Sequence, residues 1–311
     1  MSNAAPIVLF VYARLHHTKK TIDTLKKNSL ASKSELFIYS DAAKTENESV
    51  FVQEVRDYIK TIKGFKNISI FERENNMGLA KSIIDGVTKI VNEYGKVIVI
   101  EDDLEVSPYF LSYMNSSLEI YKNESSVMHV SGFMFPISVD KNTAETLFFR
   151  AASCWGWATW KRAWKYFDSD ACSLLKQIQE RKLEHEFNIQ GVTDYVGMLK
   201  KQIDGAIDSW AIRWYASVFV NGGLCLHPSQ SLVQNIGNDG TGEHCDSNDN
   251  FVVDVNNDGI HVEWQSIEES EEGLGKIKQF YLSLRQPIHV LVYNKLHNYS
   301  SKLISRIIKL G

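Results

Sequence analysis

Three consecutive acidic residues, Glu101, Asp102 and Asp103, stand directly after the aliphatic run VIVI at 97–100. Carboxylates at this spacing are suited to hold a hard divalent cation such as Mn²⁺ or Mg²⁺, which can bridge them to the oxygens of a diphosphate. The alternative is a solvated turn that binds nothing. The triplet alone does not decide between the two, so its place among the predicted helices and strands matters.

Apolar runs alternate with amphipathic helical patterns through the first hundred residues. The runs lie at 6–13, 35–41, 67–73 and 96–102. Their continuous apolar character is typical of strands covered on both faces. The alternation predicts βαβ units in an α/β fold, with a mostly parallel central sheet flanked by helices. Ligands of such sheets bind at the carboxyl ends of the strands. The acidic triplet ends the fourth run, and this position favours a functional site.

The junction after the first run, FVYARLHHTKK at 10–20, contains no glycine. It therefore lacks both the glycine fingerprint of dinucleotide-binding folds and the phosphate-binding P-loop. A carboxylate-bound cation is the other common means of holding a nucleotide's phosphates. The segment RENNMGLAKS at 73–82 reads as a loop that enters a helix, and the amino end of a helix favours anionic ligands.

Seven short segments, taken in order, resemble the GT-A nucleotide-sugar glycosyltransferases, and within them the inverting N-acetylglucosaminyltransferase I group. The most specific is EDDLEVSPYF at 101–110, in which the acidic triplet leads into a capped helix. The others are VYAR (11–14), YSD (39–41), RENNMGLAKS (73–82), CWGW (154–157), DSW (208–210) and NIGNDGTGEHC (235–245). The resemblance implies a GT-A fold with a mixed α+β acceptor-side half. It also implies an inverting, metal-dependent hexosyl- or N-acetylhexosaminyltransferase.

The resemblance implies a metal ligand at Asp103 and a second metal or diphosphate contact at His244. Contacts to the nucleotide and sugar are implied for the residues that match the family's donor-side segments. These are Arg14, Asp41, Arg73, Asn76, Lys81, Glu101, Asp102 and Trp157. The implied cofactor is Mn²⁺ or Mg²⁺, with a nucleoside-diphosphate sugar as co-substrate. Arg73 and Lys81 are equally consistent with ordinary surface charges, and most tryptophans with core positions.

An inverting transfer needs a base that deprotonates the acceptor hydroxyl. In the family this base precedes a tryptophan in a W-D-D-W-like segment, and the matching stretch here is AIDSWAIRW at 206–214. Asp208 is therefore the candidate base. Ser209 stands between it and Trp210, which departs from the family's pattern. The alternative is that Asp208 caps the helix that begins at WAIRW.

We expect a donor-binding half at 1–125, an acceptor-binding and catalytic half at 126–260 in the same domain, and a helical tail at 261–311. The end of that tail, 286–311, mixes basic and apolar residues. This pattern is compatible with peripheral contact to an anionic membrane face, or with packing on the protein. The net charge of −4 argues against a nucleic-acid partner. Because no signal-length apolar segment is recognised, the expected location is cytoplasmic. Peripheral contact with the inner face of the plasma membrane is compatible with this expectation.

The leading interpretation is an enzyme of polysaccharide biosynthesis that moves a sugar, from a UDP-sugar by preference, to a hydroxyl of a glycan or lipid-linked saccharide. One alternative is a metal-dependent phosphohydrolase or nucleotidyltransferase that uses the same acids. Such a phosphohydrolase would carry its acids after the first run, and such a nucleotidyltransferase would have a glycine- and arginine-rich first loop. The junction FVYARLHHTKK at 10–20 has neither feature. The other alternative is a non-catalytic sugar-binding module, which would tolerate the incomplete DSW match.

Overall fold

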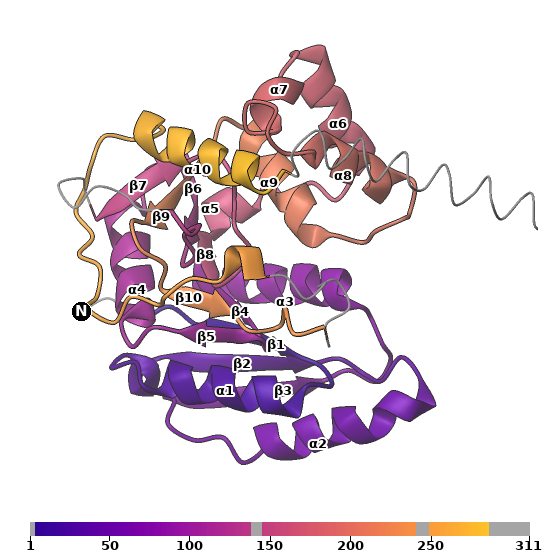
Figure 1. Cartoon of the computed structure of the whole chain (residues 1–311). Coiled ribbons are helices and arrows are strands. Elements are labelled where there is room, and N and C mark those ends of the chain that lie inside the picture. Colours follow the sequence, from indigo (N-terminus) through magenta and orange to yellow (C-terminus); the bar gives the residue numbers. More distant parts are fainter. Residues whose placement is uncertain (1–3, 138–144, 241–248, 286–311) are drawn as a thin grey trace, which may run out of the picture.

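The computed structural model describes residues 4–137, 145–240 and 249–285. Its strands form an eight-stranded sheet in the order β3-β2-β1-β4-β8-β6-β9-β7 and a small sheet of β5 and β10 (Figure 1). The strands are β1 (Ile7–Val11), β2 (Glu35–Ser40), β3 (Asn67–Glu72), β4 (Lys96–Glu101), β5 (Leu104–Val106), β6 (Val127–Ser131), β7 (Thr146–Phe149), β8 (Trp157–Trp160), β9 (Leu224–Pro228) and β10 (Val233–Asn235). The helices are α1 (Leu15–Lys26), α2 (Ser49–Ile59), α3 (Leu79–Tyr94), α4 (Phe110–Ile120), α5 (Lys161–Trp164), α6 (Ala171–Glu180), α7 (Glu184–Phe187), α8 (Tyr195–Ile203), α9 (Trp210–Val220) and α10 (Glu271–Ser283).

Strands β3, β2, β1 and β4 run parallel, and Val8 of β1 stands opposite Phe37 on one side and Val99 on the other. Every residue of β1 is buried, as expected for a strand covered on both faces. Backbone amides that are buried in this way find their partners in the neighbouring strands. The α/β class predicted from the alternating apolar runs is confirmed by this half of the sheet.

The two faces of the parallel strands are covered by different helices. Ile22 of α1 and Val55 of α2 pack on the face that Leu9 presents, whereas Val87 of α3 packs on the face that Val8 presents. Because α1 leaves β1 on one face and α3 enters β4 from the other, the carboxyl ends of β1 and β4 form the topological switch point of the sheet. Open α/β sheets bind their ligands in the crevice at this point.

Strand β8 joins the two halves of the sheet. It pairs antiparallel with β4, from Lys96 opposite Trp160 to Val99 opposite Trp157, and it also pairs with β6. The sheet is therefore continuous across residue 125, so the donor and acceptor halves are not separate bodies. The assignment of these halves to donor and acceptor stays a prediction.

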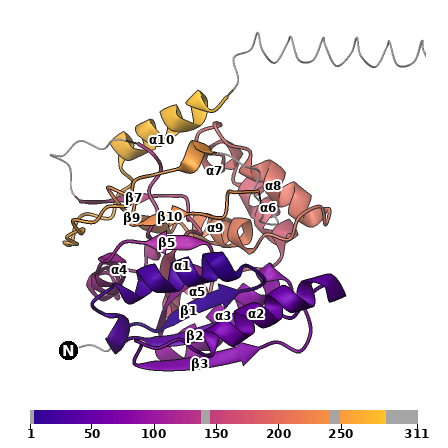
Figure 2. The ribbon, with the colours of Figure 1, turned by 60° about the horizontal axis from the view of Figure 1, so that its bottom comes forward.

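Helix α10 lies on the side of the molecule opposite to β3 in both views (Figures 1 and 2). It begins where Ser270 accepts a hydrogen bond from the amide of Gly273, and it packs through Leu274 and Ile277 into the core of the second half. Among the described residues no helix is long and apolar enough to cross a membrane. The basic and apolar segment 286–311 lies outside the described residues.

Strand β5 follows the acidic triplet directly and pairs antiparallel with β10. Leu104 stands opposite Asn235, and Val106 stands opposite Val233. This short ladder returns the chain from the second half to the end of β4. The residues that follow Asn235 are thereby placed against the acidic triplet.

Candidate acidic site at the switch point

The acidic triplet occupies the switch point of the sheet. Glu101 is the last residue of β4, and Asp102 and Asp103 form the turn that leads into β5. The residues that follow the adjacent strand β1, from Tyr12 to Arg14, stand beside this turn, because Phe10 and Glu101 are opposite one another in the register. The predicted neighbourhood of Arg14 and the triplet is therefore found in the structure.

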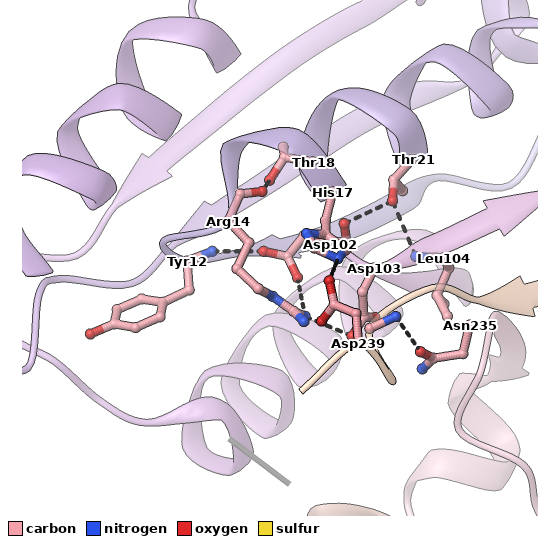
Figure 3. A network of polar contacts seen from close by, with 11 residues as sticks. Tyr12, Arg14, His17, Thr18, Thr21, Asp102, Asp103, Leu104, Asn235 and Asp239 are labelled. Carbon is pink, nitrogen blue, oxygen red and sulfur yellow. Dashed lines mark hydrogen bonds and ion pairs between the residues drawn. The ribbon is translucent and has the colours of Figure 1, made fainter. Parts of the chain in front are cut away.

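A single nitrogen of Arg14 bridges two carboxylates of the triplet (Figure 3). Its Nη2 donates to Oδ1 of Asp102 at 3.1 Å and to Oδ2 of Asp103 at 2.6 Å. Asp102 is buried and also accepts from the backbone amide of Tyr12 at 3.2 Å. Asp103 remains partly exposed. We call these two aspartates the acidic pair.

Burial dominates the electrostatics of the site. It raises the pKa of Asp102 to about 6, although the charge of Arg14 works in the opposite direction. Burial also raises the pKa of Glu101 well above its ordinary value, and the neighbouring Asp103 and Asp102 add to this rise. The pKa of Arg14 is raised, because the attraction of the acidic pair outweighs its burial. Three acids thus share one guanidinium, which leaves the site with unbalanced acidic groups.

Thr21 fixes the backbone of the acidic turn to α1. Its Oγ1 donates to the carbonyl oxygen of Asp102 at 2.9 Å and accepts from the amide of Leu104 at 3.1 Å (Figure 3). Thr21, Asp102 and Leu104 are all buried. The acidic pair is consequently held by the same helix that begins beside Arg14.

The segment after β10 covers one side of the acidic pair. The amide of Ile236 donates to the carbonyl oxygen of Asp103 at 2.8 Å. Nε2 of His17 lies 3.1 Å from Oδ2 of Asp239 (Figure 3). Gly237 lies between these contacts, and its amide donates to the side chain of Asn235. No functional indication in the sequence pointed to His17, and Gly237 lies within the NIGNDGTGEHC segment but was assigned no role.

Gly237 is the point where a side chain would collide with the acidic pair. A Cβ built on this glycine would overlap Oδ2 of Asp103, and it would lie 2.9 Å from Cγ of Asp103 and 3.0 Å from Nη1 of Arg14. Gly237→Ala is therefore expected to lower the free energy of unfolding by about 1–3 kcal/mol, because the buried ion pair must shift. Chemical denaturation measures this change.

Two further variants make the explanation specific. Gly275→Ala in α10 meets no atom within 4 Å and is expected to be neutral or stabilising. In a protein that already carries Asp103→Ala, the cost of Gly237→Ala should fall, because the overlapping carboxylate is gone. An equal cost in both backgrounds would show that the alanine acts elsewhere.

Asp41 holds the loop that precedes α3. Its carboxylate accepts from the backbone amides of Ala42, Met77 and Gly78, each at 2.9 Å. Asn76 adds a hydrogen bond from its side-chain amide to the carbonyl oxygen of Ala42 at 2.7 Å. Asp41 and Asn76 therefore position the loop between β3 and α3. Their contacts with a nucleotide stay predictions.

Arg73 and Lys81 take different positions on this loop and helix. Arg73 pairs with Asp85 of α3, and its guanidinium lies over the ring of Tyr39, 5.0 Å from the ring centre. Lys81 is exposed in the first turn of α3. Among the described residues no hydrogen bond or ion pair joins either side chain to the acidic pair. Their roles toward a donor stay predictions as well.

The structure corrects the expectation for Trp157. This residue was expected beside the donor and acceptor, but its side chain is fully buried at 0% exposure. Its ring stacks on those of His129 and Trp210, with distances between ring centres of 5.4 and 5.1 Å. The physical reason is that the first residue of β8 points its side chain into the core under α3 and α9. Trp157 is therefore a core residue, and its ring is not accessible for stacking on a ligand.

Asp208 precedes α9 and is 56% exposed at its side chain. Its Oδ1 accepts from Nη2 of Arg213 at 2.8 Å, whereas Ser209 is the residue that caps the helix, through the amide of Ile212. The alternative that Asp208 serves as the cap is therefore not what the structure shows. Trp210 stacks on Trp157, which pairs with a residue near the end of β4, so the start of α9 lies toward the carboxyl end of that strand.

Asp103 is the one predicted metal ligand that the described residues include. His244 lies outside the described residues. Among the described residues no group of three or more histidine, cysteine or acidic side chains is arranged to hold a metal ion. A cation at the acidic pair would therefore complete its coordination with water or with oxygens of a ligand.

The chain resembles several solved structures at low sequence identity. No curated protein matches the chain. Among solved structures, the mannosyltransferase PcManGT from Pyrobaculum calidifontis, in complex with GDP-Man and Mn²⁺, is 11% identical, with a TM-score of 0.41 and coverage of 70% of this chain and 69% of that one. S. aureus TarS is 16% identical, with a TM-score of 0.31 over 45% of this chain and 24% of TarS. A UDP-glucose pyrophosphorylase complexed with UDP-glucose is 12% identical, with a TM-score of 0.35 over 72% and 90%.

The family comparison covers more than half of the sequence. The model of the GNT-I family matches residues 1–169, which include β1 to β4, Arg14 and the whole acidic triplet. The resemblance to the N-acetylglucosaminyltransferase I group, and with it glycosyltransferase as the class of enzyme, is confirmed. The chain belongs to the GNT-I family.

Proposed function

We propose that the protein transfers a sugar, with inversion, from a nucleoside-diphosphate sugar to a hydroxyl of a glycan or lipid-linked saccharide. A UDP-sugar is the favoured donor. The observation that carries the proposal is the acidic pair at the switch point, bridged by Arg14. This is the place where an α/β sheet binds its ligand, and its charges suit a diphosphate with a bound cation. Residues 1–125 would then bind the donor and 126–260 the acceptor.

The residues of the acidic pair fit a divalent cation. Carboxylate oxygens are the ligands that Mg²⁺ and Mn²⁺ prefer, and those of Asp102 and Asp103 converge within hydrogen-bond distance of one nitrogen atom. The pair offers two carboxylates to the one guanidinium of Arg14. Asp103, with Asp102, would hold the cation, which supplies neutralisation of the charge that develops on the leaving diphosphate.

Asp208 would accept the proton of the attacking hydroxyl. Its exposed carboxylate stands before α9 and is oriented by Arg213, whose Nε also donates to the carbonyl oxygen of Ser209 at 3.0 Å. A base must be held at one place while it remains accessible to the acceptor. The pairing with Arg213 provides this orientation, and the exposure of Asp208 provides the access.

The acceptor would bind in a cleft of about 630 Å³ beside β10. Amide and carboxylate side chains from 254–258 line it over an apolar floor that includes Phe135, a combination that suits the hydroxyls and apolar faces of a saccharide. The cleft is tied to β10, because the amide of Val253 donates to the side chain of Gln234 at 2.7 Å. The far end of β10 leads to Gly237 and the acidic pair.

Substitutions in this cleft should change acceptor binding alone. Asn257→Ala and Asp258→Ala, at exposed lining positions, are each expected to raise the KM for the acceptor by roughly tenfold, the value of about one hydrogen bond. The KM for the donor should not change. Glu263→Ala is the matched control, because this residue is exposed on the same segment but does not line the cleft. Steady-state kinetics with each substrate varied separately measure the effect, and an unchanged acceptor KM would remove the cleft from the proposal.

Metal binding should depend on pH through Asp102. The pKa of this residue is about 6, and a carboxyl group must lose its proton to bind a cation. Mn²⁺ affinity is therefore expected to fall by roughly tenfold per pH unit below pH 6. Asp102→Asn should flatten this dependence. In the metal-free protein the raised pKa means that the folded state binds this proton more tightly than the unfolded state does. The free energy of unfolding that Asp102 contributes is therefore lost as the pH rises through about 6. Calorimetric titration of Mn²⁺ at pH 5 to 8 tests the prediction.

The decisive experiment for the function is donor screening. Calorimetry with a panel of nucleotide sugars in the presence of Mn²⁺ is expected to find one that binds, and nuclear magnetic resonance of the product should show the inverted anomer. A failure of every nucleotide sugar to bind, with or without metal, would refute the proposal. Release of inorganic phosphate or pyrophosphate instead of a nucleoside diphosphate would favour the phosphohydrolase or nucleotidyltransferase alternative.

A further inference from the structure

The guanidinium of Arg14 occupies the place that a shared cation would take. Its Nη2 lies between one oxygen of Asp102 and one oxygen of Asp103, and no other Lys or Arg among the described residues forms an ion pair with either carboxylate. A divalent ion held by the acidic pair would have to compete with Arg14 for these two carboxylates. The protein therefore supplies an internal positive charge where the proposed function requires an external one.

Arg14 cannot release the acidic pair by losing its proton. A guanidinium stays charged in proteins, and the pKa of Arg14 is raised further by the two carboxylates. The acidic pair is largely buried, so the departure of Arg14 without a replacement would leave uncompensated charge. A cation that arrives alone must therefore compete with Arg14 or displace it into the solvent.

Arg14 has a second nitrogen with unused capacity. Its Nη1 is buried and makes no hydrogen bond within the described part of the chain. It lies close to the backbone of Gly237, since a Cβ built there would stand 3.0 Å from this nitrogen. A guanidinium binds two oxygens of a phosphate side by side, so the diphosphate of a donor is a partner that Arg14 could exchange for the carboxylates.

We propose that Arg14 keeps the acidic pair closed to divalent cations until a diphosphate binds and takes over its guanidinium. The proposal rests on the proposed function. The cation and the donor's diphosphate then bind as one unit, and each strengthens the binding of the other. Arg14 is in this sense a positioning residue that sets the order of binding.

Mn²⁺ affinity measured by electron paramagnetic resonance tests this exchange without any turnover. The wild-type protein is expected to bind Mn²⁺ weakly when alone and at least about tenfold more tightly with UDP. Arg14→Gln is expected to bind Mn²⁺ alone at least about tenfold more tightly than the wild type, since unit charges a few ångströms apart interact by more than this amount even at an effective dielectric constant near 20. UDP should then strengthen Mn²⁺ binding less than it does in the wild type.

Three variants serve as controls. Lys20→Gln removes an exposed positive charge that pairs with Glu105 and is expected to leave Mn²⁺ affinity nearly unchanged. Arg14→Lys keeps the charge and should resemble the wild type in the absence of UDP. Adding Asp103→Asn to Arg14→Gln should abolish the gained affinity, which assigns it to the acidic pair.

The proposal is overturned if Arg14→Gln binds Mn²⁺ no more tightly than the wild type. If that variant does not fold, the wild-type measurement decides, because equal Mn²⁺ affinity with and without UDP also overturns it. The failure of the proposed function is a different result. It would appear as tighter Mn²⁺ binding with UDP in a protein that binds no nucleotide sugar. The exchange alone fails if the protein transfers sugar but its Mn²⁺ affinity changes neither with Arg14→Gln nor with UDP.

Discussion

Asp103→Asn is expected to lower kcat/KM by about a thousandfold or more and to abolish the dependence of donor binding on Mn²⁺. Asparagine keeps the size of the side chain but removes the negative charge that would hold the cation against the diphosphate. Neutralisation of a leaving group by a metal contributes several kcal/mol, and about 4 kcal/mol corresponds to a thousandfold in rate. Calorimetry of donor binding with and without Mn²⁺, together with initial rates, measures both effects.

Glu105→Gln is the matched control for this substitution. Glu105 lies two residues further along the chain, pairs with Lys20 at 3.5 Å and is more exposed than Asp103. It should keep full activity and metal dependence. Donor binding by Asp103→Asn that still strengthens with Mn²⁺ would show that the cation binds elsewhere, and the acidic pair would then have a structural role only.

Asp208→Asn is expected to lower kcat by about a hundred- to ten-thousandfold while the affinity for the donor stays the same. This range is typical for the loss of a general base. The amide can still accept from Arg213, so the start of α9 should keep its structure. A reduced kcat with unchanged donor binding separates a catalytic defect from a folding defect, and thermal denaturation of the variant provides a direct check.

Asp204→Asn is the comparison for the base. Asp204 ends α8 four residues before Asp208 and has no assigned role. It should transfer sugar at the wild-type rate. A fully active Asp208→Asn protein would refute the assignment, and the base would then have to be sought among other acids, such as Glu101 at the end of β4.

The parallel half of the fold was predictable because its signal is local. Strands buried on both faces need continuous apolar runs, and the runs that contain Val8, Ile38 and Val99 all became neighbours in the sheet. The antiparallel insertion of β8 between β4 and β6 was not predicted. Trp157 and Thr159 give no indication of which strands they pair with, because that choice is made by packing between segments distant in sequence.

The same distinction applies to the site. The acidic triplet was predicted from its place after an apolar run, because ligands of parallel sheets bind at the carboxyl ends of the strands. Arg14 was implied by the family resemblance. Gly237 and the contact between His17 and Asp239 were missed, because they depend on the pairing of β5 with β10 across most of the chain. Trp157 was misplaced because an aromatic residue type does not reveal whether its ring faces a ligand or the core.

The pairing of β4 with β8 also determines which motions the protein can use. Enzymes that close two domains around a substrate rotate them about a hinge of a few residues. Here the register from Lys96–Trp160 to Val99–Trp157 joins the two halves by hydrogen bonds between β4 and β8. A rigid-body rotation of one half against the other would break these hydrogen bonds. Under the proposed function, substrate entry and product release would use rearrangements of connecting loops, and the sheet would keep the acidic pair and Asp208 in fixed relative positions.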